Sequence, residues 1–171
     1  LSAHSFLIRK IKIFLVLVVP IFIILFPVLI RGEFFLQGDA LSYTYPSGWF
    51  YQHHLGSHWN PYIALGVPFD VTAHSGFLSP VYRFFYSILP FFFAYHSLIF
   101  FNLILTSLFS FLFARKIGLQ TLAAILVAYV ATFSQWNMLW LSNLNIINVA
   151  PLVPLLFFFI CKINEGDKRY Y

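Results

Sequence analysis

The chain has 171 residues, of which 61% are hydrophobic and only 9% are charged, and its net charge is +5. A soluble domain carries about 25% charged residues, and a soluble core of this length cannot cover so much apolar surface. The composition therefore excludes an ordinary soluble enzyme and predicts a protein solvated by lipid. The basic residues stand in small clusters beside apolar runs, where they set membrane topology and require no nucleic-acid partner.

The first apolar run predicts a membrane span at about residues 12–31. It contains 18 consecutive uncharged residues, 13–30, which as a helix would be about 27 Å long, close to the roughly 30 Å of a hydrocarbon core. Pro20 and Pro27 interrupt its hydrogen bonding, but membrane helices tolerate such breaks. A cleaved signal peptide is the alternative. The run is longer than the usual apolar region of such a peptide, and no small-residue cleavage site follows it, so an uncleaved span is favoured.

Three further spans follow from two long uncharged stretches. Pro90 divides the first stretch into a short interfacial helix over 81–89 and a second span at about 91–114. The second stretch is long enough for two spans, at about 119–134 and 146–162, and its polar and aromatic midpoint predicts the tip of a hairpin. The predicted fold class is therefore all-α: a polytopic transmembrane helical bundle of four spans, with a long outer first loop that contains short interfacial helices.

The distribution of charge predicts the orientation. With the N-terminus in the cytoplasm, eight basic residues lie inside and only Arg31 and Arg83 lie outside, as the positive-inside rule requires. All four tryptophans then fall on the outer side. We therefore predict a multi-pass protein of the plasma membrane with both ends of this segment cytoplasmic. Residues 1–171 are expected to form a single membrane module, the N-terminal part of a longer protein. The inside residues are Arg9, Lys10, Lys12, Arg115, Lys116, Lys162, Lys168 and Arg169.

A long outer loop, residues 32–80, follows the first span, and it is far longer than the about 4–6 residues of an ordinary connection. It holds the outward-facing carboxylates Glu33, Asp39 and Asp70. Asp39 is the candidate catalytic residue, because a carboxylate at the membrane surface can take a proton from an attacking hydroxyl or hold a divalent cation against a phosphate. The alternative is that Asp39 only caps a helix that begins near Ala40.

The rest of the loop suggests local structure and one weak metal motif. An amphipathic helix is expected over 43–55, and turns are expected at 60–61 and 67–68. His54 and His58 have the spacing of a zinc pair on one face of a helix. No third ligand accompanies them at metal-site spacing, so we interpret them as interfacial histidines.

Four polar side chains outside the loop are also candidates for a role. Arg83 could bind a lipid-linked phosphate, since a guanidinium group binds phosphate oxygens through two hydrogen bonds. Alternatively, its side chain could extend to the lipid headgroups. His96, Asn102 and Asn148 lie within the predicted spans, where polar groups usually bond across the bundle. No nucleotide-binding or soluble hydrolase motif is present.

One span followed by a long outer loop that opens with Gly38 and Asp39 resembles the start of the YfhO-like bacterial membrane proteins. The middle of the loop is similar to that family's Trp-Asn-Pro, Gly-x-Pro and Ser/Tyr-Pro sequence, and the segments ARKIGLQTLAAILVAYVATFS and NVAPLVPLLFF resemble its third and fourth spans. The other residues that carry the resemblance are Tyr43, Tyr45, Pro46, Trp59, Asn60, Pro61, Gly66, Pro68, Ser79 and Pro80.

The YfhO-like proteins are similar to the wider GT-C superfamily of membrane glycosyltransferases. The resemblance implies transfer of a sugar from a polyprenyl-phosphate donor to an acceptor on the outer face of the membrane. It implies Asp39 as the catalytic base or as a ligand of Mg²⁺ or Mn²⁺. Tyr43, Trp59, Asn60 and Arg83 would bind substrate. The implied partners are the lipid bilayer and a polyprenyl-phosphate-linked sugar, and no nucleic acid.

One departure from the family concerns the tip between the third and fourth spans. Relatives often carry a histidine there, whereas this chain has Asn143 and Asn145. The alternative functions are a non-catalytic transporter or flippase subunit for lipid-linked glycans and a membrane scaffold without chemistry. A transporter needs polar residues along a path through the bilayer, and His96, Asn102 and Asn148 are too few to line one.

Overall fold

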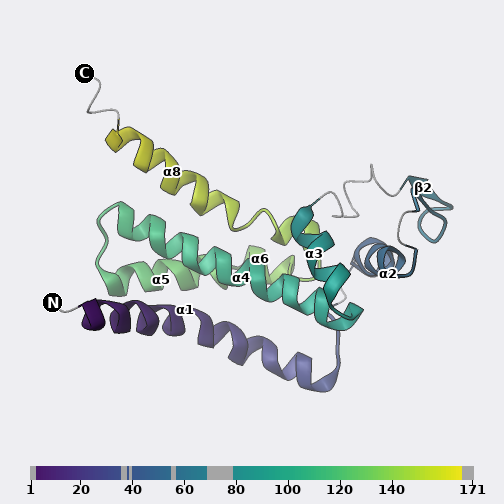
Figure 1. Ribbon diagram of the computed structural model, residues 1–171, viewed down its shortest axis with the longest axis horizontal. Helices are drawn as coiled ribbons and strands as arrows, with labels where there is room; N and C mark the ends of the chain where they lie inside the picture. Colours follow the sequence, from purple (N-terminus) through teal and green to yellow (C-terminus); the bar gives the residue numbers. More distant parts are fainter. Residues whose placement is uncertain (1–2, 36–37, 39, 55–56, 69–78, 167–171) are drawn as a thin grey trace.

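The computed structural model describes residues 3–35, 38, 40–54, 57–68 and 79–166. The chain is mostly helical in these ranges, with one small two-stranded sheet (Figure 1). Four of its helical segments are long and apolar enough to cross a membrane, which confirms the predicted all-α polytopic bundle. The four segments are Leu7–Arg31, Phe91–Lys116, Thr121–Leu139 and Leu144–Asn164.

Proline shapes the first span, which lies in α1 (Ala3–Arg31). Pro20 has no N–H, so the carbonyl of Val16 is left without its helical partner. The hydroxyl of Tyr129, which belongs to α5 (Thr121–Thr132), donates to that carbonyl at 2.6 Å. A neighbouring helix therefore satisfies the backbone group that the proline frees, as membrane helices require.

Two helices end in the same glycine-based motif. Gly32 follows α1 with a φ of 64°, and Gly118 follows α4 (Phe91–Lys116) with a φ of 94°. In both, the N–H of the next residue donates at 3.1 Å to the carbonyl five residues before it. This is the Schellman arrangement, in which a left-handed glycine lets the chain satisfy the last helical carbonyls. The motif fixes where the first span releases the loop and where the second turns into the third.

The helix α4 is the centre of the bundle. It packs against α1, α5 and α8 (Leu152–Gly166), and Figure 1 shows α8 on the opposite side of α4 from α1. Asn102, buried in α4, donates from Nδ2 to Oδ1 of Asn148 at 2.6 Å, so these two amides bond across the bundle as expected. His96 behaves differently: its Nδ1 lies 2.8 Å from the carbonyl of Phe92 in its own helix.

The third and fourth spans are interrupted. A bend at 133–134 separates α5 from α6 (Gln135–Leu139). Turn residues likewise separate α7 (Leu144–Ile147) from α8. The main helix of the fourth span therefore begins at Leu152, later than the predicted 146. Pro151 and Pro154 explain this start, because proline is tolerated in the first turn of a helix but not in its interior.

The loop folds onto the ends of the spans through two short helices. The helix expected over 43–55 is α2 (Tyr45–His53), which follows a π-helical turn, η1 (Ala40–Thr44). The helix expected over 81–89 is α3 (Pro80–Ile88).

Close packing joins α2 to α3 and to the start of α4. The Nε2 of Gln52 donates to the carbonyls of Tyr86 and Leu89 at 2.8 and 2.7 Å. A Cβ added to Gly48 would lie 2.8 Å from the Tyr86 hydroxyl oxygen and 2.9 Å from the ring of Phe91. Only glycine permits so close an approach, and α2 is therefore held against the bundle.

The turn expected at 67–68 is wrong, whereas the turn expected at 60–61 is present in part, because Asn60 ends a strand and Pro61 begins a turn. The strands β1 (Trp59–Asn60) and β2 (Val67–Pro68) pair as an antiparallel hairpin. The reversal lies between them, where Ala64, Leu65 and Gly66 have φ values of 48°, 65° and 109°. Three successive residues with positive φ reverse the chain between Pro61, which is in the turn region, and Pro68, which is in β2.

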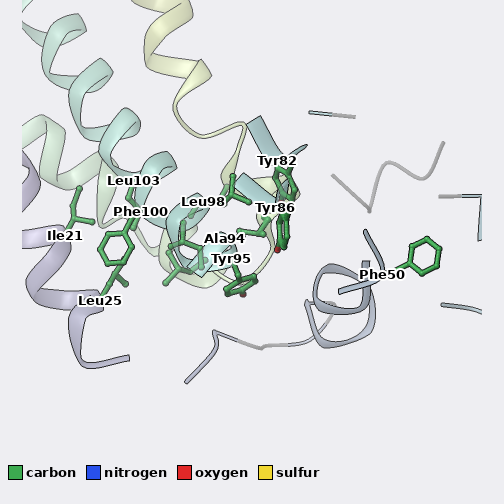
Figure 2. Close-up of a cluster of buried hydrophobic side chains, with 14 residues drawn as sticks. Ile21, Leu25, Phe50, Tyr82, Tyr86, Ala94, Tyr95, Leu98, Phe100 and Leu103 are labelled. Atoms are coloured by element: carbon green, nitrogen blue, oxygen red, sulfur yellow. The ribbon is translucent and has the colours of Figure 1, made fainter. Parts of the chain in front are cut away.

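The buried core lies where α1, α3 and α4 meet. Figure 2 shows Ile21 and Leu25 of α1 beside Phe100 of α4, and Tyr82 and Tyr86 of α3 close to the start of α4. Only 22% of the most apolar window of the first span is buried, core residues included, and only 11% of the window of the fourth span. Soluble proteins rarely expose such continuous apolar surface. These faces meet lipid, and the chain is a membrane protein.

Candidate functional site

The chain that leaves the first span is fixed to the start of α4. We call this end of the bundle, where α1 ends and α4 begins, the loop end. The ring of Phe34 lies 5.1 Å from that of Phe92 and 5.4 Å from that of Tyr95. The Tyr95 hydroxyl donates to the carbonyl of Phe35 at 2.5 Å. The first residues of the loop therefore pack on the spans.

Asp39, the predicted catalytic residue, lies outside the described residues, and its roles as base, metal ligand or helix cap stay predictions. Its described neighbours differ sharply in burial. Gly38 is exposed and has a φ of 53°, whereas Ala40 is fully buried and begins η1. Asp70 also lies outside the described residues. Glu33 is exposed directly after the glycine that ends α1.

The four predicted substrate-binding residues lie on three different elements. Tyr43 is half-buried in η1, Trp59 and Asn60 form β1, and Arg83 is exposed on α3. Figure 1 shows β2 on the side of α2 that faces away from α3. The structure therefore brings Trp59 and Asn60 together on one hairpin and separates them from Arg83.

The hairpin buries the side chain of Asn60 and packs the ring of Trp59 on Gly66. Asn60 is fully buried, and its Oδ1 accepts a hydrogen bond from the backbone N–H of Tyr62 at 3.0 Å. The indole of Trp59 covers Gly66, where an added Cβ would lie 2.5 Å from it. The Asn60 side chain therefore shapes the turn, while about half of the Trp59 side chain stays exposed for contact with a ligand.

The described residues offer little to a metal ion. No group of three or more His, Cys, Asp or Glu side chains that could hold one occurs among them. The ring of His54 instead stacks on Phe50 at 4.9 Å and lies 5.9 Å from that of Tyr62. Because Asp39 lies outside the described ranges, the Mg²⁺ or Mn²⁺ that the resemblance implies there stays a prediction.

Two buried tyrosines of α3, Tyr82 and Tyr86, lie at the loop end. Burial raises the pKa of Tyr82 and of Tyr86 well above the ordinary value, and the neighbouring tyrosines add to the effect. Both phenols are therefore neutral at physiological pH.

Sequence reasoning missed a cavity of about 750 Å³ between α4 and the two interrupted spans. The polar residues after the third span, which the sequence predicts to form the tip of a hairpin, include Asn137 and Asn143, and these are only 4% and 7% exposed. The Nδ2 of Asn137 lies 2.7 Å from the carbonyl of Ala131 and 3.3 Å from that of Thr132. This amide therefore donates hydrogen bonds to backbone carbonyls at the end of α5, which have no partner within the helix. The only signal was a run of amides and tryptophans inside an uncharged stretch.

The fold and the lipid-facing surfaces define a multi-span α-helical membrane protein. Comparison of the chain with known protein families, curated proteins and solved structures found no match.

Proposed function

We propose that this chain is a membrane glycosyltransferase-like protein of YfhO and GT-C type. It transfers a sugar from a polyprenyl-phosphate donor to an acceptor on the outer face of the plasma membrane. The observation that carries the proposal is the anchored start of the loop. Phe35, which precedes Asp39, is hydrogen-bonded to Tyr95 at the start of α4, and Ala40, which follows it, is buried. The apolar tail of a polyprenyl phosphate keeps its phosphate at the same depth as this start of the loop.

The reaction is a single displacement at the anomeric carbon. An acceptor hydroxyl attacks that carbon while the Asp39 carboxylate takes the hydroxyl proton. The bond from the anomeric carbon to the phosphate oxygen breaks, and polyprenyl phosphate leaves with the electron pair. A divalent cation, where bound, would neutralise charge on the leaving phosphate.

The other predicted residues bind the substrates. Arg83, exposed on α3, suits the phosphate, since its guanidinium matches two phosphate oxygens. The half-buried ring of Tyr43 offers a face to a sugar. Trp59 lies apart from them on the hairpin and is assigned to the acceptor, whereas the fully buried Asn60 holds the turn beside it.

The loop end is assigned to the outer side. Figure 1 shows that α1 begins, α4 turns into α5 and α8 ends at the opposite end of the bundle. That end carries Arg9, Lys10, Arg115 and Lys116, and the positive-inside rule places such a cluster in the cytoplasm.

The test is Asp39→Asn in the full-length protein, assayed with a radiolabelled polyprenyl-phosphate sugar in reconstituted vesicles. Loss of a general base should lower the transfer rate by about 10²–10⁴-fold, with insertion and yield unchanged. Glu33→Gln and Asp70→Asn are matched controls that should keep near-normal transfer. Normal transfer by Asp39→Asn would contradict the assignment, and normal transfer by all three variants would contradict the catalytic role of the loop.

A further inference from the structure

The cavity between α4 and the two interrupted spans is bounded by breaks in two helical segments. Backbone that is not helical at membrane depth is tolerated only where it is buried in protein or lines a cavity, and discontinuous helices form substrate sites in membrane proteins. Here both breaks line the same cavity: Ser134 belongs to the first, and Val149 and Ala150 belong to the second. Because the breaks in the third and fourth spans both line this cavity, the arrangement favours a binding site over a packing defect.

The cavity reaches the middle of the bundle. Asn148, at the second break, bonds to Asn102, which lies about halfway along α4. Thr106 and Ser110 line the cavity from α4 one and two turns further on. A ligand here lies at bilayer depth, where a charge without a partner is very costly.

The residues that line the cavity include Trp140, which supplies an unused donor, and Asn143, which supplies an unused acceptor. The indole Nε1 of Trp140 and the Oδ1 of Asn143 are buried, and neither has a hydrogen-bond partner among the described residues. Both residues line the cavity, and Asn143 is only 7% exposed. An indole N–H can only donate, and a carboxamide oxygen can only accept.

This pair selects the chemistry of a ligand. A phosphate only accepts and an ammonium only donates, so each would leave one of the two groups unsatisfied, whereas a hydroxyl both donates and accepts. None of the described residues that line the cavity is charged, which disfavours ions further. Most of the remaining wall is apolar and includes Val153 and Pro154 of α8, which suits a hydrocarbon chain. The volume falls within the about 300–1,000 Å³ of ligand sites.

We propose that this cavity binds an uncharged lipid with free hydroxyl groups, of the monoglyceride class. Its hydroxyl head lies by Trp140 and Asn143, and its acyl chain lies along α8. The site is separate from the loop, and binding can be measured without any transfer reaction.

The experiment is photo-crosslinking of the full-length protein in nanodiscs with a diazirine-bearing monoglyceride. Labelled peptides should map to α6 and α8. Unlabelled monoolein should compete, whereas methyl oleate, which has the same chain and no hydroxyl, should compete at least tenfold less well. Labelling elsewhere, absence of labelling, or equal competition by methyl oleate would each overturn the proposal. Absence of labelling is the result expected if a further helix fills the cavity instead.

Variants separate the hydrogen bonds from the cavity volume. Trp140→Phe removes the donor and Asn143→Leu removes the acceptor at similar size, and each should weaken monoolein competition by about three- to tenfold. Ala150→Phe should fill the space and abolish labelling. Trp136→Phe is the matched control, because the indole of Trp136 also lines the cavity but is 60% exposed, and it should bind as the unmodified protein does. Unchanged binding in both Trp140→Phe and Asn143→Leu would overturn the hydroxyl assignment.

Discussion

At the scale of single residues, Pro20 and Tyr129 are complementary. The proline removes a backbone donor inside the first span, and the tyrosine of α5 supplies a hydroxyl donor to the carbonyl that is left, at 2.6 Å. In lipid no water can take that place. Tyr129 therefore acts as a polar link between two otherwise apolar helix faces.

This pairing predicts that the cost of losing the hydroxyl depends on the proline. Tyr129→Phe should lower the free energy of unfolding by about 1–3 kcal/mol, because it leaves the Val16 carbonyl unsatisfied. In a Pro20→Ala background the alanine N–H restores the helical bond, and the same substitution should cost much less. Denaturant titration in micelles measures both values. Equal costs in the two backgrounds would show that the hydroxyl does not serve this carbonyl.

A second residue-scale prediction concerns His54 and His58. We expect no obligatory zinc at this pair, because no third ligand stands at metal-site spacing and His54 packs among aromatic rings. Elemental analysis of purified full-length protein should find zinc well below one equivalent, unchanged in His58→Ala. Stoichiometric zinc that disappears in His58→Ala would refute this.

Single residues also mark the limit of what could be predicted from the sequence. The bond between Asn102 and Asn148 was foreseeable, because an amide in a long uncharged run has to find a partner across the bundle. The roles of Asn137 and Asn143 were not, because local polarity does not say whether a side chain faces solvent or a cavity. Asp39 stays a prediction that rests on the family resemblance.

At the scale of elements, hydropathy located the spans but not their interruptions. Neither proline nor glycine stands at the bend after α5. The bend is stabilised instead by Ser134, whose Oγ accepts from the N–H of Asn137 at 3.3 Å, and by the Asn137 amide itself. A serine followed by an amide occurs in many continuous helices, so only tertiary packing makes the pattern a break.

The short helix α3 gives a prediction about pH. Because burial raises the pKa of Tyr82 and Tyr86 above the ordinary 10, the folded state holds their protons more tightly than the unfolded state does. Their contribution to stability is therefore constant below about pH 10 and falls as pH rises above it. Alkaline titration in micelles should show a late-ionising tyrosine fraction, followed by ultraviolet absorbance, together with loss of the folded state.

Substitution assigns the late titration phase. Changing Tyr82 and Tyr86 to phenylalanine should remove part of it, because these are the buried phenols whose pKa is raised. Ionisation of all tyrosines in one step near pH 10 would contradict the burial of α3.

At the scale of the whole molecule, the main prediction is orientation. With Cys161→Ser as background, single cysteines at Ser57 and Gln120, both exposed, report on opposite ends of the bundle. Gln120 is preferable to Gly118, whose φ of 94° would strain a larger residue. An impermeant maleimide on intact cells should label Ser57→Cys alone, because the basic cluster keeps the other end in the cytoplasm. Labelling of Gln120→Cys alone would invert the topology.

The interrupted third span has a consequence for how the chain is made. α5 has 12 residues and is about 18 Å long, too short to bridge a hydrocarbon layer of roughly 30 Å by itself. As the nascent chain leaves the ribosome, α5 therefore enters the bilayer best as a hairpin with α4, joined by the tight turn at Gly118. The amide that closes its open end follows Thr132 by only five residues, so the hairpin has all its backbone partners once Asn137 has been added.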